Sequence, residues 1–136
     1  MGLQTLIHER NIALQDLHKR ILHSSVNKNL LTTDIIVSII LEEKAPRFYI
    51  TPHQAELLIR KYRNDGCRFP SDKIGPRREM IMDLNENYER LVARFPHTPK
   101  KTIFKMLVEQ PAKSFYMRDY RVRDVILNYR RYAKRK

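Results

Sequence analysis

The stretch Ala45-Pro46-Arg47-Phe48-Tyr49-Ile50 decides the fold, because a similar stretch, Ala112-Lys113-Ser114-Phe115-Tyr116-Met117, returns 67 positions further along the chain. The same offset aligns apolar residues with apolar residues on both sides of the two stretches, for example Ile59 with Ile126. A run of agreements at one constant offset is the signature of an internal repeat. The sequence therefore predicts an internal duplication.

Each predicted repeat contains a long helix, a short helix, the Phe-Tyr turn and a third helix. The long helices are expected at about 3–24 and 78–95, and the third helices at 52–64 and 118–134, because apolar residues recur there at three- and four-residue steps. The start of the first of these third helices is well marked, since Thr51 is a capping residue followed by a proline and, three positions on, a glutamine.

The short helix of the first repeat follows the capping residues Thr32, Thr33 and Asp34, and taken alone it could also be a buried strand, because Ile35–Leu41 is rich in β-branched residues. The repeat favours a helix. The equivalent segment of the second repeat has Lys105 among apolar residues at helical steps, and it follows Thr98 as cap and Pro99 as first helical residue.

These patterns predict an all-α fold of about six helices in a single domain, 1–136. The first repeat covers about 5–65, a basic linker about 66–77 and the second repeat about 78–134. Equivalent elements of a duplication often pack together, so the two Phe-Tyr turns are also expected to lie side by side, with a two-stranded ribbon as one possible form.

Composition limits the class of protein. A hydrophobic content of 42% is enough for one modest core, and three glycines favour helices over a sandwich or barrel. A single cysteine, Cys67, excludes an internal disulfide and fits a reducing compartment. The longest apolar run, Ile35–Leu41, is too short to span a membrane. We expect a cytoplasmic protein without a signal peptide and without membrane association.

The net charge of +12 is concentrated in two stretches. Residues 60–78 contain seven basic residues against two acidic ones, and residues 113–136 contain nine against two. These are equivalent places in the duplication, the end of each third helix and the chain that follows. On the final helix, Arg123, Arg130 and Lys134 share one face, with Tyr120 beside them as an exposed aromatic suited to stacking or to a sugar contact.

A basic ridge with an exposed aromatic indicates phosphate contacts. The alternative interpretation is that these are ordinary cations at helix C-termini, where the macrodipole favours them, or a basic tail. The candidate nucleic-acid-binding residues are Arg60, Lys61, Arg63, Arg77, Arg78, Arg118, Arg121, Arg123, Arg130, Arg131, Lys134 and Arg135.

No catalytic or cofactor motif stands out in the sequence. The five histidines lack the spacing of zinc ligands, no glycine-rich phosphate loop is present, and no serine lies in a nucleophile elbow. Helix-surface carboxylates such as Asp16 and Glu86 have basic neighbours and are interpreted as ion-pair partners. We therefore expect no catalytic residues, no metal and no cofactor.

The first expectation for function is a non-enzymatic nucleic-acid-binding protein, with DNA favoured over RNA. The order helix, turn, basic helix is similar to that of helix-turn-helix DNA binders, although the turn at 45–50 is longer and lacks a glycine. The alternative is an assembly or adaptor protein of a phage or mobile-element complex that binds other subunits, as a homo-oligomer or with a protein partner. Sequence specificity and biological process stay open at this point.

Overall fold

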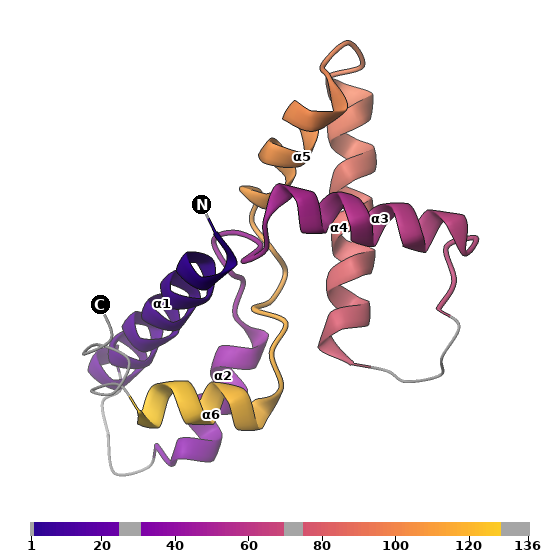
Figure 1. Cartoon of the computed structure of the whole chain (residues 1–136). Coiled ribbons are helices and arrows are strands. Elements are labelled where there is room, and N and C mark those ends of the chain that lie inside the picture. Colours follow the sequence, from indigo (N-terminus) through magenta and orange to yellow (C-terminus); the bar gives the residue numbers. More distant parts are fainter. Residues whose placement is uncertain (1, 25–30, 70–74, 129–136) are drawn as a thin grey trace.

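The protein folds into six α-helices in the computed structural model, which describes residues 2–24, 31–69 and 75–128 (Figure 1). No strand occurs in these residues, so the predicted all-α class is confirmed. The helices are α1 (Leu3–Ser24), α2 (Thr33–Glu42), α3 (Pro52–Asn64), α4 (Pro76–Arg94), α5 (Lys100–Val108) and α6 (Asp119–Leu127). None of the described helices combines the length and apolar character needed to cross a membrane.

The helix boundaries follow local chemistry that the sequence displays. Thr51 accepts a hydrogen bond from the Gln54 backbone N–H, and the Gln54 side chain accepts one from the Thr51 N–H, so α3 starts with a complete capping box. At α2 the cap is simpler, since only the Thr32 side-chain oxygen takes part and accepts the N–H of Ile35. The expected cap of α5 is wrong by one residue: Pro99 itself is the N-cap, because its carbonyl accepts the first helical hydrogen bonds.

The six helices form two bundles, and each bundle combines helices from both predicted repeats. One bundle contains α1, α2 and α6, and the other contains α3, α4 and α5. Figure 1 shows the first bundle at the lower left and the second at the upper right. The third helix of each predicted repeat therefore packs on the long and short helices of the other one. The residues expected to extend the last helix beyond 128 lie outside the described part of the chain.

The two Phe-Tyr stretches lie side by side where the chain passes between the bundles. Ala45 and Ala112 form an antiparallel bridge, and their two backbone hydrogen bonds are each 3.0 Å long. The rings stack across it in reciprocal fashion: Phe48 on Tyr116 with centroids 6.3 Å apart, and Tyr49 on Phe115 with centroids 6.1 Å apart. In each stack the phenylalanine of one stretch pairs with the tyrosine of the other, so the two stacks are reciprocal.

The two-stranded ribbon, one possible form of this contact, is reduced to a single antiparallel bridge in the described structure. The chain bends directly after both alanines, at 46–47 and at 113–114. Pro46 also fixes its φ near −65°, far from the value of about −140° that an antiparallel strand requires. Pairing therefore stops after one residue on each side, and the aromatic stacks continue the contact.

The prediction that α2 and α3 form a helix-turn-helix-like pair is wrong. That motif requires its two helices to pack together, whereas α2 packs on α1 and α6, and α3 packs on α4 and α5. The connection between the two helices is extended: Glu43 and Thr51, at its two ends, both have extended backbone angles, and the segment carries α3 across to the other bundle. The duplication itself stays a prediction.

Candidate nucleic-acid interface

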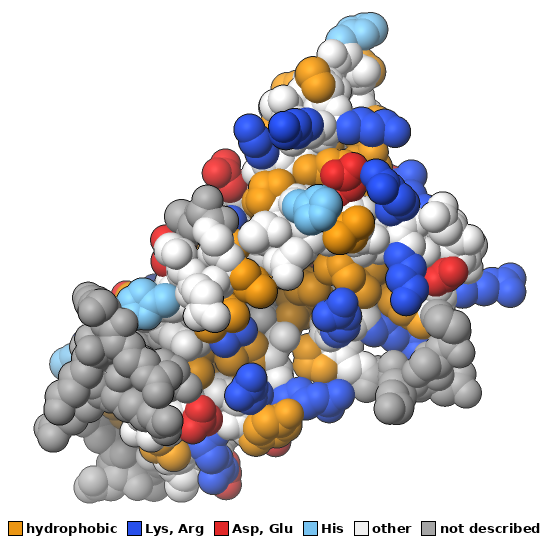
Figure 2. Space-filling view, viewed as in Figure 1, with side chains coloured by type: hydrophobic (Ala, Val, Ile, Leu, Met, Phe, Trp, Pro, Cys, Tyr) orange, Lys and Arg blue, Asp and Glu red, His pale blue; other side chains and the backbone are white. Residues whose placement is uncertain are grey.

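A hollow of about 550 Å³ lies where the end of α3 and the start of α4 face the start of α6, between the two bundles. We call it the basic groove. Figure 2 shows several Lys and Arg side chains at the junction of the bundles and others across the upper-right bundle. The residues that line the basic groove are Arg10, Leu58, Lys61, Tyr62, Asp65, Arg68, Phe69, Gly75, Pro76, Arg77, Arg78, Ile81, Tyr116, Met117, Arg118, Tyr120 and Arg121.

The charge of the groove is strongly one-sided. Asp65 is the only carboxylate among its described lining residues, against seven basic side chains. Six of these cations form no ion pair with any described carboxylate: Lys61, Arg68, Arg77, Arg78, Arg118 and Arg121. Like charges held together in a concave site repel one another, and an entering anion relieves that repulsion.

The positions of these cations along their helices oppose the macrodipole. Arg77 and Arg78 lie in the first turn of α4, Arg118 is the N-cap of α6, and Arg121 lies in its first turn. A helix N-terminus carries partial positive charge, so cations there are destabilising. The interpretation that the basic residues merely complement helix C-termini therefore accounts for Lys61 near the end of α3 and not for these four arginines.

The N-cap residues of α4 and α6 provide no side-chain cap, although Glu79 and Asp119 lie in the first turns of these helices and Asp119 Oδ1 accepts the Tyr120 N–H at 2.8 Å. The two starts approach each other closely. A Cβ atom placed on Gly75, the N-cap of α4, would lie 3.0 Å from the Arg118 Nη2 atom. Glycine thus allows the guanidinium of Arg118 to lie directly over the beginning of α4.

Aromatic side chains stand among the cations. Tyr62 and Phe69 pack with ring centroids 5.0 Å apart, and the Arg78 guanidinium lies 4.6 Å from the Phe69 centroid. Tyr120 differs from both. It is 63% exposed, and its ring has no aromatic or cation partner among the described residues. The groove therefore presents an open aromatic face beside unpaired cations.

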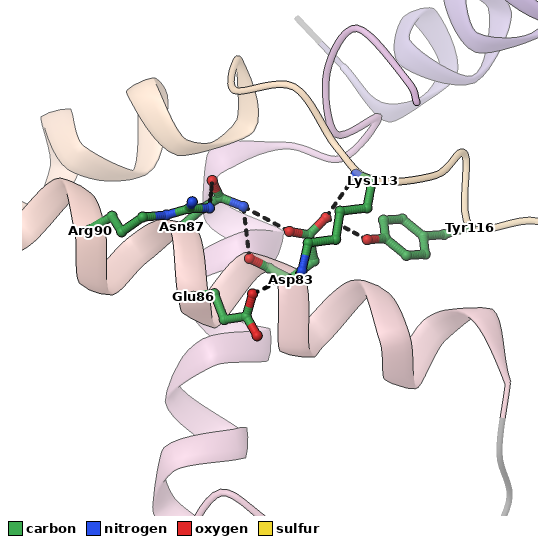
Figure 3. A network of polar contacts seen from close by, with 6 residues as sticks. All are labelled: Asp83, Glu86, Asn87, Arg90, Lys113 and Tyr116. Atoms are coloured by element: carbon green, nitrogen blue, oxygen red, sulfur yellow. Dashed lines mark hydrogen bonds and ion pairs between the residues drawn. The ribbon is translucent and has the colours of Figure 1, made fainter. Parts of the chain in front are cut away.

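Tyr116 joins the groove to a buried polar network on α4. Its hydroxyl donates a hydrogen bond to Asp83 Oδ2, which also accepts the backbone N–H of Lys113 at 3.0 Å. Asn87 Nδ2 donates to Asp83 Oδ1 at 2.8 Å, and Arg90 donates to Asn87 Oδ1 at 2.7 Å. In Figure 3 the Tyr116 ring points from the turn toward Asp83. The network fixes this wall of the groove to α4.

This network also holds the Tyr116 hydroxyl in its neutral form. Burial raises the pKa of Tyr116 well above its ordinary value, and the hydrogen bond to Asp83 and the Asp83 charge add to the rise. A phenol that stays protonated remains a donor to Asp83 across the physiological range.

No family model, no curated protein and no solved structure matches this chain. Within the described residues, no group of three or more His, Cys, Asp or Glu side chains is placed to hold a metal ion.

Strained backbone also collects at the groove. Two non-glycine residues of the described chain have positive φ: Tyr116 at 54°, which lines the groove, and Cys67 at 58°, which lies between the lining residues Asp65 and Arg68. Gly66, beside Cys67, has a φ of 72°. Left-handed backbone costs a non-glycine residue about 1 kcal/mol or more, and such residues concentrate at functional sites.

The structure divides the residues predicted from the sequence into three sets. Lys61, Arg77, Arg78, Arg118 and Arg121 line the basic groove. Arg60, Arg63 and Arg123 lie outside it and pair with Glu56, Glu89 and Asp34, respectively. Arg130, Arg131, Lys134 and Arg135 lie outside the described residues.

Arg63 shows why some predicted cations have a packing role. Its guanidinium donates to Asn85 Oδ1 at 2.9 Å, pairs with Glu89 at 3.3 Å and lies 4.9 Å from the Tyr88 ring centroid. All three partners belong to α4, so Arg63 holds α3 on α4. Its charge is already compensated and is less available to a ligand.

The sequence interpretation missed several groove residues. Arg68 belongs to the first charged stretch but is not among the residues singled out from the sequence. The sequence interpretation assigns Tyr62 to the core, Phe69 to the linker and Tyr116 to a turn. Arg10 carried a visible signal, because it interrupts the apolar stripe of the first helix. In the structure Arg10 lines the groove and hydrogen-bonds to Asn11 Oδ1 at 3.1 Å.

Proposed function

We propose that this protein binds nucleic acid, with DNA as the expected polymer, and that the basic groove contacts the phosphates. The observation that carries the proposal is the meeting of two basic stretches, far apart in sequence, in one hollow where their cations have no described carboxylate partner. Phosphate groups are the anions that such guanidinium clusters suit best, because an arginine can donate two parallel hydrogen bonds to one phosphate.

The placement of the arginines adds a second line of support. Four of them lie at helix starts, where they lower the stability of their own helices. A bound phosphate reverses this effect, since it is attracted by the guanidinium groups and by the positive ends of the same helices. The arrangement is unfavourable in the free protein and favourable in a complex.

The test compares two double variants that remove the same charge. Arg77→Gln with Arg121→Gln empties part of the groove, whereas Arg60→Gln with Arg123→Gln removes two exposed cations that pair with carboxylates elsewhere. Fluorescence anisotropy with labelled DNA, between about 50 and 200 mM salt, gives the slope of log affinity against log salt. Each lost phosphate contact reduces that slope by about 0.7–0.9.

We expect the groove variant to reduce the slope by about 1.5 and the control to leave it nearly unchanged. Equal losses in the two variants would show that net charge alone drives binding and would remove the groove from the proposal. A labelled RNA of the same sequence tests the choice of polymer. Absence of binding to every nucleic acid, together with a stable large oligomer in light scattering, would favour the adaptor alternative.

A further inference from the structure

We infer that the ligand of the basic groove is a single strand, with one unpaired base stacked on Tyr120 and the neighbouring phosphates on Arg118 and Arg121. The inference rests on the proposed function and names the form of nucleic acid that the site accepts. Three observations carry it: the size of the hollow, its concave placement and the open ring of Tyr120.

The size of the hollow excludes a double helix from its interior. At about 550 Å³ it falls among clefts that hold small ligands, roughly 300–1,000 Å³. Proteins that read duplex DNA usually insert a projecting helix or ribbon into a major groove about 12 Å wide. The cations of this site instead line a recess between two bundles. A flexible strand can enter such a recess with its phosphates and bases, whereas a duplex can touch only the rim.

The open ring of Tyr120 indicates an unpaired base. In a duplex both faces of each base are covered by its neighbours, so an aromatic side chain gains a stacking partner only when a base is unstacked. Tyr120 is on α6, one residue from Arg121 and two from Arg118, and all three line the groove. One nucleotide can therefore place its base on the ring while its phosphate meets the guanidinium groups.

The other aromatic side chains of the groove already pack against protein groups, so they support its wall and are not open to a base. Phe69 has Tyr62 against it and the Arg78 guanidinium over its ring. Tyr116 is stacked on Phe48 and hydrogen-bonded to Asp83. Tyr120 is thus the groove aromatic with an uncommitted ring among the described residues, and the inference assigns the stack to it alone.

The chain contains no tryptophan, which gives the inference a direct spectroscopic test. The Tyr120→Trp variant of the full chain places one fluorophore at the proposed stacking position. The Leu127→Trp variant is the control, because Leu127 is also exposed, at 60%, and lies on the same helix about 10 Å further along its axis and outside the groove lining. Both substitutions are at exposed positions, so both variants should fold, which circular dichroism verifies.

Each variant is titrated with a thymine-only single strand of about 12 nucleotides, with a hairpin duplex and with thymidine monophosphate. We expect the single strand to bind at least tenfold tighter than the duplex and to quench the emission of the Tyr120→Trp variant only. Tyr120→Ala should weaken single-strand binding about tenfold, and Leu127→Ala should not.

Other results separate the two proposals. Duplex binding as tight as single-strand binding, or equal quenching in both tryptophan variants, would overturn the single-strand inference and leave nucleic-acid binding intact. Binding of thymidine monophosphate as tight as that of the strand would make the groove a nucleotide pocket and overturn the inference as well. If none of the three ligands bound, the proposed function itself would be overturned.

Discussion

Ala45 and Ala112 exchange both of their backbone hydrogen bonds, N–H to carbonyl at 3.0 Å in each direction, at the point where the chain passes between the two bundles. Both residues are buried, at 2% exposure. The segment that leads to α3 and the segment that leads to α6 therefore satisfy each other's backbone hydrogen bonds where they cross. The consequence is that each third helix is delivered to the bundle that contains the other predicted repeat's first two helices.

The exchange of third helices predicts where a core mutation acts. Ile59 on α3 and Ile126 on α6 occupy matching positions of the predicted repeats and are about equally buried, at 2% and 3% exposure. Replacing either with alanine should lower the free energy of unfolding by about 2–5 kcal/mol. In native-state hydrogen exchange, Ile126→Ala should loosen the amides of α1 and α2, and Ile59→Ala those of α4 and α5.

The two variants act as controls for each other, because the same side chain is truncated at equivalent depth. If Ile126→Ala loosened α4 and α5, the helices that directly precede α6 in the chain, the exchanged packing would be contradicted. Simultaneous loss of protection in all helices would show that the two bundles unfold as one unit, and milder Ile→Val variants would then be compared.

The sequence was sufficient to predict where the helices lie in the chain, but it was insufficient to predict which helices pack together. Periodicity and caps predicted α1 and α3 within a residue, because those signals are local. The exchange is not local. The two third helices present matching apolar residues, Ile59 and Ile126 among them, so either could pack on either pair of partner helices as far as the pattern shows.

The site was predictable in charge and not in geometry. Charge counting found the two basic stretches, and Lys61, Arg77 and Arg121 among them line the groove. It could not separate these from Arg123, which pairs with Asp34 far away in the sequence. The ion pair of Arg60 was easier to predict from the sequence, since its partner Glu56 is four residues earlier on the same helix face.

The capping box of α3 predicts a measurable local effect. Thr51→Ala removes the oxygen that accepts the Gln54 N–H and should lower the free energy of unfolding by about 1 kcal/mol. Thr51→Ser keeps an acceptor at the same position and should have little effect. Urea unfolding followed by circular dichroism measures both, and a Thr51→Ser variant as unstable as Thr51→Ala would show that the methyl group matters instead.

The hydrogen bond between Tyr116 and Asp83 predicts a larger effect at neutral pH. Tyr116→Phe removes the hydroxyl donor and leaves the buried Asp83 Oδ2 with the Lys113 N–H alone. The expected loss of unfolding free energy is about 1–3 kcal/mol, measured by urea unfolding. Tyr120→Phe is the matched control, since its exposed hydroxyl has no hydrogen bond to a described residue and its removal should change stability by less than about 0.5 kcal/mol.

The same hydrogen bond predicts that stability falls at alkaline pH. Burial and Asp83 raise the pKa of Tyr116 in the folded protein, whereas in the unfolded chain this phenol ionises near pH 10. Above about pH 10 the unfolded state therefore binds fewer protons than the folded state, and the free energy of unfolding decreases as pH rises. The slope for one group is at most about 1.4 kcal/mol per pH unit, and solvent around the half-buried ring reduces it.

Urea unfolding between about pH 9 and 11 should therefore show a steeper decline in the free energy of unfolding for the native sequence than for Tyr116→Phe, which cannot ionise there. All other ionisable groups are the same in the two proteins, so their contribution cancels in the difference. Parallel declines in the two proteins would mean that Tyr116 ionises as readily when folded as when unfolded, and that Asp83 does not hold its proton.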